Sequence, residues 1–270
     1  MLLSEIDKII DTISVHNLKK NIKFKKISRS SKLIDKFTIF IINYKNKKNE
    51  KYLIEAIRNN APAIISEKYI KEIKLPQFIV KDTNIAVKIL LKELFPYSPH
   101  RTIAITGTNG KTSVAWYISE LCKYNNINCK MLGTLGYYIN GKKIKDTLLT
   151  TPAYEELYQF CFDRKIKNYN FVFETSSHAL SQNRISNIPI DVGAITNLSL
   201  DHLDYHKDFY SYKNAKLKLF KMYLKSEGEA IINSRIKNFK NLFKVLKKRK
   251  IKTIVYGSKD IYFNKSKKVL

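Results

Sequence analysis

Apolar residues in the second part of the sequence alternate between short runs typical of buried strands and longer stretches with helical spacing. Predicted strands span residues 102–106, 128–132, 171–174, 192–196, 229–232 and 252–256, and predicted helices span 112–124, 154–165, 209–223 and 236–248. A hairpin is expected over 137–144, turning on Asn140-Gly141. Alternating strands and helices predict a mainly parallel sheet with its ligands at the carboxyl ends of the strands.

A smaller α/β unit is predicted upstream. Its pattern indicates strands over 37–42 and 63–66 and helices over 50–58 and 83–95. Pro96 and Pro99 end the last of these helices, because proline interrupts helical hydrogen bonding. We therefore expect a small N-terminal α/β domain, residues 1–98, and a central domain, residues 99–270, whose mainly parallel sheet is flanked by helices. The chain stops shortly after a strand, so the central domain is expected to be incomplete at its C-terminal end.

Composition excludes several classes of protein. With 44% hydrophobic and 12% aromatic residues the chain can form a core, and no apolar run is long enough for a transmembrane helix. The three cysteines have neither metal-site nor disulfide-framework spacing. We expect a cytoplasmic, monomeric protein without membrane insertion. The net charge of +27 comes from lysines dispersed among Ile and Asn, with only seven arginines among the fifty basic residues, which favours compositional drift over specific nucleic-acid binding.

A glycine-rich segment between a predicted strand and a predicted helix is the first candidate functional motif along the chain. Its sequence, Gly107-Thr108-Asn109-Gly110-Lys111-Thr112 with Ser113, is typical of a phosphate-binding loop at a helix N-terminus. Lys111 would neutralise phosphate oxygens, and the Thr112 hydroxyl would bind Mg²⁺. The general pattern places a further glycine where Ile105 stands, so this loop is a shortened variant. Its context favours nucleotide binding over a turn that binds nothing.

Further polar segments follow other predicted strands. They are Thr150-Thr151-Pro152, Glu174-Thr175-Ser176-Ser177-His178-Ala179-Leu180 and Thr196-Asn197-Leu198-Ser199-Leu200-Asp201-His202-Leu203-Asp204-Tyr205-His206, with Lys216 on the helix after the last. A carboxylate, imidazoles and hydroxyls at one edge of a nucleotide-binding sheet suit metal-assisted phosphoryl transfer. Each residue alone would more often be structural.

Together, in this order and spacing, these segments resemble the Mur ligase family, ATP-dependent amide ligases of peptidoglycan precursor synthesis. The second and third segments, with Gln182 and Arg184, are most similar to the MurE type, which adds the third residue of the stem peptide. The resemblance implies that ATP phosphorylates the terminal carboxylate of a UDP-N-acetylmuramoyl dipeptide and that a diamino acid then attacks to form an amide. The resemblance is dense from Arg101 to about Phe220.

The resemblance also implies roles for individual residues. Positions that match catalytic ones are Lys111, Glu174, His202 and Lys216. Thr112 and Glu174 would help to hold a first Mg²⁺ and His202 a second. Lys216 matches a lysine that relatives convert with CO₂ into a carbamate, an oxygen ligand for Mg²⁺. Residues that match substrate-gripping positions are Thr150, Thr151, Ser176, Gln182 and Arg184.

This sequence departs from the family in several places. The N-terminal domain should hold the uridine end, but its Asp-Ser-Arg turn reads Ser30-Ser31-Lys32, and the glycine-bearing run after the next strand reads Asn43-Tyr44-Lys45-Asn46. A late Asn-Asp-Asp turn reads Asn233-Ser234-Arg235. The family's C-terminal ligase domain, which holds the amino acid, is expected to be absent from these residues. A natural truncation and a piece of a longer chain both fit.

Three other functions remain open at this point. A folylpolyglutamate synthase shares the phosphate loop but should lack the segments that follow Phe173 and Ile195. A remnant would bind nucleotide or UDP-sugar without catalysis. A nucleic-acid-binding protein is supported by charge alone.

Overall fold

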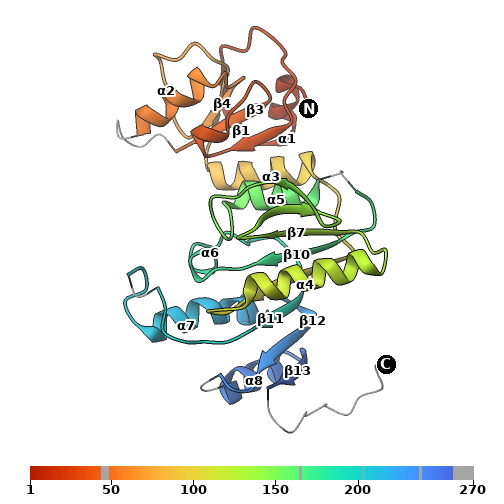
Figure 1. Ribbon diagram of the computed structural model, residues 1–270. Coiled ribbons are helices and arrows are strands. Elements are labelled where there is room, and N and C mark those ends of the chain that lie inside the picture. Colours follow the sequence, from red (N-terminus) through yellow and green to blue (C-terminus); the bar gives the residue numbers. More distant parts are fainter. Residues whose placement is uncertain (44–48, 164–165, 203, 237–238, 258–270) are drawn as a thin grey trace. The chain divides into compact units, whose positions relative to one another are not determined.

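The structure is a computed structural model that describes residues 1–43, 49–163, 166–202, 204–236 and 239–257 (Figure 1). It divides into two compact units: residues 1–97 with 158–163, and residues 98–157 with the described residues beyond 163. Within the described residues, no helix is both long and apolar enough to cross a membrane.

The first unit is built on a five-stranded sheet. The strand order is β1 (Thr12–His16), β5 (Gln77–Val80), β4 (Ile64–Ser66), β3 (Thr38–Ile42) and β2 (Lys26–Ser28), parallel except for β1. Its helices are α1 (Ile6–Ile9), α2 (Glu50–Arg58) and α3 (Thr83–Leu94), with single 3₁₀ turns at Leu3–Glu5 and Ser31–Leu33. Every residue of β3 is buried, and Phe40 and Ile42 share a core cluster with Leu53 of α2. Since successive strand side chains point to opposite faces, both faces of this sheet are covered.

The second unit is built on an eight-stranded sheet. The order is β13 (Lys252–Tyr256), β12 (Leu224–Asn233), β11 (Ile190–Ile195), β6 (Arg101–Thr106), β10 (Asn170–Glu174), β7 (Cys129–Gly133), β8 (Gly136–Ile139) and β9 (Lys142–Lys145). The six strands from β13 to β7 are parallel, and β8 and β9 add an antiparallel edge. β6 therefore lies centrally, between β11 and β10.

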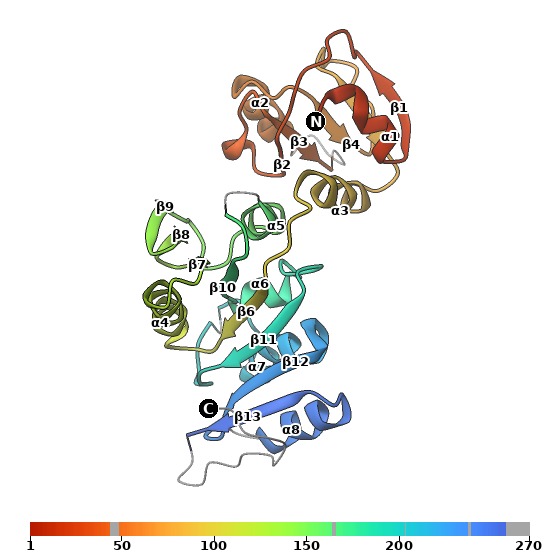
Figure 2. The ribbon, with the colours of Figure 1, turned by 90° about the vertical axis from the view of Figure 1, so that its right-hand side faces the viewer.

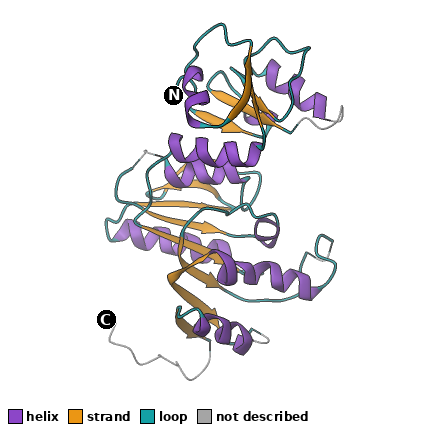
Figure 3. Cartoon of the chain, turned by 180° about the vertical axis from the view of Figure 1, so that it is seen from behind, coloured by secondary structure: helices purple, strands orange, loops and turns teal. Residues whose placement is uncertain are grey.

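Helices cover both faces of the second sheet (Figures 2 and 3). One face packs against α4 (Lys111–Tyr124): Ile105, Met131 and Val172 share a buried cluster with Ala115 of that helix. α6 (Ser177–Ser181), α7 (Phe209–Lys218) and α8 (Phe239–Lys248) lie on the other face, and α5 (Tyr154–Phe162) precedes β10. Phe171 and Phe173, two residues apart on one face of β10, are fully buried and stack at 4.9 Å between ring centroids.

The α/β fold class and the mainly parallel sheet are confirmed, as are the predicted strands of the second unit and the hairpin. Three strands were not predicted, β1, β2 and β5. The helix predicted to reach residue 223 is α-helical only to Lys218 and continues as one π-helical turn, Leu219–Tyr223. The helix predicted over 154–165 ends at Phe162, with 164–165 outside the described residues, and the helix predicted from residue 236 begins at Phe239.

Truncating a buried side chain of β10 should strongly destabilise the second unit. Phe173→Ala removes a fully buried ring from β10, and such a change costs about 3–5 kcal/mol of the free energy of unfolding. Urea unfolding followed by the fluorescence of Trp116, the single tryptophan, would report the loss as a lower midpoint. Leu121→Ala is the matched control: Leu121 lies on α4 and is 62% exposed, so its truncation should leave the midpoint nearly unchanged. Equal midpoints for both variants would contradict this account of the core.

Candidate functional site

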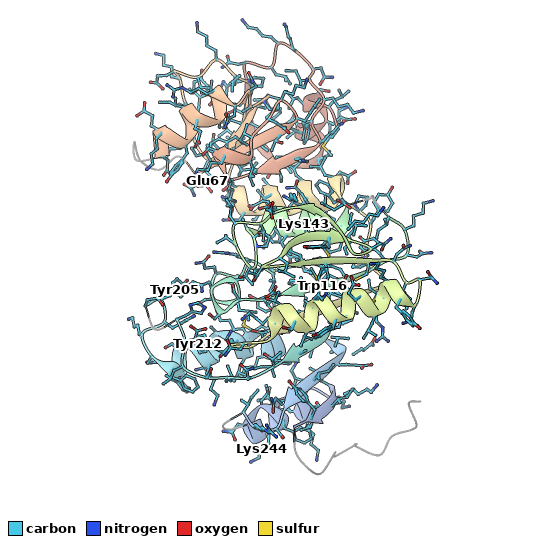
Figure 4. The ribbon with its side chains drawn as sticks, viewed as in Figure 1. Glu67, Trp116, Lys143, Tyr205, Tyr212 and Lys244 are labelled. Carbon is cyan, nitrogen blue, oxygen red and sulfur yellow. The ribbon has the colours of Figure 1, made fainter. Side chains whose placement is uncertain are left out.

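The residues singled out for the site lie in the second unit. Most of them end or follow β6, β10 and β11 or lie on α4, α6 and α7, and Thr150 and Thr151 lie between β9 and α5. Parallel pairing of β11 with β6, and of β6 with β10, brings the three strand ends to one edge. Figure 4 labels Tyr205 and Tyr212, which lie at this edge. Strand topology thus places segments that are far apart in the sequence around one site.

The loop after β6 is shaped by two glycines. Gly107 has a φ of 143°, and a Cβ there would lie 1.9 Å from Thr196 Oγ1. Gly110, with a φ of 81°, directly precedes the first residue of α4. Only glycine adopts such a φ without strain, so the loop can pass close to β11 and turn directly into the helix.

The segment after β11 holds the loop in place. The Asn109 N–H donates to Asn197 Oδ1 (2.9 Å), and the Asn109 carbonyl accepts from Thr196 Oγ1 (2.6 Å). The Thr196 carbonyl in turn accepts from Asn233 Nδ2 at 2.7 Å and from the Tyr256 hydroxyl at 3.1 Å. The outer strands β12 and β13 are therefore linked to the loop through one residue.

The loop and the first turn of α4 fit a phosphate group. The N–H groups of Lys111, Thr112 and Ser113 belong to the first helical turn, where the helix provides no backbone acceptor. Lys111 Nζ donates to the carbonyls of Gly107 (2.9 Å) and Thr108 (2.8 Å), so its charge lies directly over the loop. Burial lowers the pKa of Lys111, although the carboxylates of Glu174 and Asp201 oppose that shift.

A buried carboxylate lies beside the loop. Glu174 is 1% exposed; its Oε2 accepts from the Thr112 hydroxyl (2.9 Å), and its Oε1 accepts from the Thr134 N–H (2.7 Å). A Cβ on Gly133 would lie 2.0 Å from Oε1, so only glycine leaves room for this carboxylate. A hydroxyl and a carboxylate are the hard oxygen ligands that Mg²⁺ prefers, and the structure brings Thr112 and Glu174 together.

A second lysine enters the site from α7. Lys216 is 1% exposed, and its Nζ donates to the Gly107 carbonyl at 2.7 Å, the same oxygen that accepts from Lys111. Burial, with the positive charge of Lys111, lowers the pKa of Lys216 to about 7, against the attraction of Asp201. An amine that is substantially neutral near pH 7 can react with CO₂, so the side chain fits the carbamate that the resemblance implies.

Three histidines form an aromatic cluster at the same edge. The His178 ring lies 5.0 Å from His202 and 5.8 Å from His206, and 4.1 Å from the Tyr205 ring. Burial and the neighbouring imidazoles lower the pKa of His178 and of His206. His202 Nε2 lies 3.5 Å from Asp201 Oδ2. In the part of the chain that the structure describes, no three His, Cys, Asp or Glu side chains converge as a metal cluster, so the protein's own donors to a metal here are few.

The residues predicted to grip the substrate form one hydrogen-bonded network. Arg184 Nη1 donates to the Thr151 carbonyl (2.8 Å), and Arg184 Nε donates to Gln182 Oε1 (2.8 Å). The Thr151 hydroxyl accepts from the Ser176 N–H at 3.0 Å. The Thr150 hydroxyl lies 3.1 Å from that of Thr134, which brings this network to the carboxylate of Glu174. Spatial proximity supports a shared site, although these internal bonds also suit a purely structural role.

Sequence reasoning missed several residues of the site. Tyr212 bonds the loop residue Thr108, Thr134 holds Glu174, and the Tyr205 hydroxyl accepts from Gln182 Nε2 at 3.1 Å. The spacing of Tyr212 and Lys216, four residues apart on one helix, could have indicated a shared face. Thr134 acts mainly through its backbone N–H, which leaves no signal in the sequence.

Comparison with known proteins defines the class of this fold and site. Residues 105–269 match the Mur ligase middle domain, and the chain belongs to the Mur ligase family. That match spans the phosphate loop, Glu174, the histidines and Lys216.

The relatives are named for one type within that family. The chain is 34% identical over 253 residues to the UDP-N-acetylmuramoyl-L-alanyl-D-glutamate--2,6-diaminopimelate ligase of Rickettsia montanensis. The aligned residues cover 90% of this chain and 53% of the relative. The ligase of the same name from Alkaliphilus oremlandii is 34% identical over 217 residues, 78% of this chain and 44% of the relative. The chain therefore spans about half the length of the curated relatives it matches.

Solved structures agree with this relationship. A structure of a ligase with that name aligns with a TM-score of 0.67 and 28% identity over 95% of this chain and 52% of its own. MurF ligase from Thermotoga maritima in complex with ADP shares the fold, with a TM-score of 0.58 and 18% identity over 87% of this chain and 51% of its own.

The buried amine of Lys216 should make stability depend on pH. Between about pH 7 and pH 10.5 the unfolded chain keeps a proton that the folded Lys216 has released, so the free energy of unfolding rises with pH. In CO₂-free buffer, wild type should gain on the order of 2 kcal/mol relative to Lys216→Met between pH 7 and pH 9. Denaturant unfolding at both pH values measures this difference. Lys218→Met, on the same helix, is the control; a pH-independent difference for Lys216→Met would contradict the lowered pKa.

Proposed function

We propose that this protein acts as, or within, an ATP-dependent ligase that joins a diamino acid to UDP-N-acetylmuramoyl-L-alanyl-D-glutamate in peptidoglycan biosynthesis, as a cytoplasmic monomer. One observation carries the proposal: the glycine loop, Thr112 bonded to the buried Glu174, and the buried Lys216 converge at one sheet edge, in a chain of the Mur ligase family.

Nucleotide binding is assigned to the loop from Gly107 to Ser113. Its first-turn N–H groups and Lys111 would bind the phosphates, and Thr112 with Glu174 would hold Mg²⁺. When bound, Mg·ATP supplies the phosphoryl group that activates the terminal carboxylate of the dipeptide, so that the amine of the diamino acid can form the amide. The protein's part is to fix the phosphates, exclude water and neutralise charge, because electrostatic stabilisation dominates phosphoryl transfer.

Lys216 is proposed to act as a carbamate. Its burial and its lowered pKa, near 7, support the reaction of the neutral amine with CO₂. The carbamate would add a carboxylate to a site where no three described His, Cys, Asp or Glu side chains form a metal cluster, and it would neutralise the positive charge beside Lys111. With His202 it would serve a second Mg²⁺.

The dipeptide is assigned to the network of Thr150, Thr151, Ser176, Gln182 and Arg184. The guanidinium of Arg184 suits a carboxylate or pyrophosphate through its planar fork. The first unit, corresponding to the predicted domain 1–98, is proposed to hold the uridine end.

Binding without catalysis is the second candidate function. It is favoured by the substituted Ser30-Ser31-Lys32 turn, where the Ser31 hydroxyl donates to the Glu55 carboxylate instead of pointing freely to a ligand. Amide formation from ATP, the UDP-linked dipeptide and a diamino acid distinguishes the two candidates. We expect the 270-residue chain alone to bind Mg·ATP with little amide synthesis. Failure of the folded protein to bind either Mg·ATP or the dipeptide would contradict the assignment.

Removing the loop lysine should weaken nucleotide binding. Lys111→Ala deletes the ammonium group above the Gly107 and Thr108 carbonyls, and we expect at least a tenfold increase in the Kd for Mg·ATP, about 1.4 kcal/mol. Isothermal titration calorimetry would measure it. Lys123→Ala, in the last turn of the same helix and half-exposed, should bind like wild type. Unchanged affinity in folded Lys111→Ala would remove the assignment of the loop.

Removing the second lysine should abolish amide synthesis in the ligase that contains these residues. We expect Lys216→Ala to lose activity, because the carbamate can no longer form, and to regain part of it when acetate or formate supplies the missing carboxylate. Lys218→Ala should keep full activity with or without added carboxylate. Full activity in Lys216→Ala would rule out the carbamate role.

A further inference from the structure

Tyr212 is a buried aromatic residue that none of the assigned roles includes. It lies on α7, is 0% exposed, and its hydroxyl is 2.9 Å from Thr108 Oγ1 in the phosphate loop (Figure 4). Burial raises its pKa to about 12, so the phenol stays protonated at neutral pH. A buried phenol normally needs a hydrogen-bond partner, and here that partner belongs to the loop.

The hydrogen bonds around Thr108 favour the phenol as the donor. Thr108 Oγ1 accepts from the Ser199 N–H at 3.0 Å, and the Ser199 carbonyl, 3.2 Å away, can accept its single hydroxyl hydrogen. With that hydrogen in use, the bond between Thr108 and Tyr212 is completed when the phenol donates. Tyr212 thus supplies a specific donor to a loop residue that is itself 8% exposed.

The ring of Tyr212 also lies against the other groups of the site. Lys216 Nζ is 4.7 Å from its centroid, one helical turn further along α7. The His206 ring lies 5.5 Å away and the His202 ring 6.3 Å away. The bulk of the ring limits where the Lys216 side chain can lie.

We propose that Tyr212 is a positioning residue that couples the phosphate loop to Lys216: its hydroxyl holds Thr108, and its ring holds the lysine side chain over the Gly107 carbonyl. The same residue thereby ties α7 to the nucleotide loop, so that the conformation of one affects the other. This inference rests on the proposed function, because it concerns the nucleotide and carbamate sites.

A double-mutant cycle tests the hydroxyl. Tyr212→Phe keeps the ring and removes one hydrogen bond, and should weaken Mg·ATP binding about fivefold, with Thr108→Val weakening it at least as much. The double variant should bind no more weakly than Thr108→Val, because both changes remove the same bond. Tyr210→Phe, on the same helix and 73% exposed, is the matched control and should bind like wild type.

A structural role would give a different result. It would lower the melting temperature of Tyr212→Phe without changing its affinity for Mg·ATP, or it would make the losses of the two single variants multiply. Either outcome overturns the coupling, while wild type still binds the nucleotide. Failure of wild type to bind Mg·ATP overturns the proposed function and this inference together.

A second measurement tests the ring. In ¹³C-labelled bicarbonate, wild type should give a carbamate resonance in ¹³C NMR that Lys216→Met lacks. Tyr212→Phe should keep that resonance, and Tyr212→Leu should lose most of it while retaining its far-ultraviolet circular dichroism. Equal carbamate occupancy in Tyr212→Leu and wild type overturns the ring's part. If Tyr212→Leu does not fold, loss of the resonance in Tyr212→Phe would overturn it instead.

Discussion

Two lysine side chains donate to one backbone oxygen, and the rest of the site depends on that contact. Lys111 comes from the helix that follows the phosphate loop, and Lys216 comes from α7, more than a hundred residues later, yet both reach the Gly107 carbonyl. Like charges so close raise each other's energy, and burial makes this worse. The arrangement favours an anionic ligand, because an anion would offset the repulsion between the two ammonium groups.

The carbonyl is available to both lysines because the loop lies close against β11. That closeness requires Gly107, since any side chain there would overlap Thr196. Thr196 and Asn197 then fix Asn109, and the Thr108 hydroxyl is held from two directions. A loop fixed in this way changes little on binding a ligand, which reduces the entropic cost of binding. The parallel sheet makes this possible by ending three strands at one edge.

Much of this could be predicted from the sequence, and the reasons differ between residues. Strand–helix alternation located the sheet, and the glycine loop located the candidate site, because both depend on local patterns. β2, β4 and β5 are harder to predict from the sequence, because each is only three or four residues long. Of these three strands, only β4 was predicted. The link between Lys216 and Gly107 is a tertiary contact across 109 positions, so the sequence alone indicates it only through resemblance. The π-helical turn after α7 buries Leu219 and Phe220, and the periodicity of the sequence did not distinguish it from a continued α-helix.

Glu174 is held by two neighbours that will tolerate mutation very differently. Gly133 contributes by lacking a side chain, and since every other amino acid is larger, no replacement preserves the space that the carboxylate fills. Thr134 contributes mostly a main-chain N–H, which every residue except proline also has. In a library of substitutions at these adjacent codons, position 133 would therefore accept only glycine, whereas position 134 would accept most residues other than proline. The missing Cβ of Gly133 is therefore a stricter requirement at this site than the side chain of Thr134.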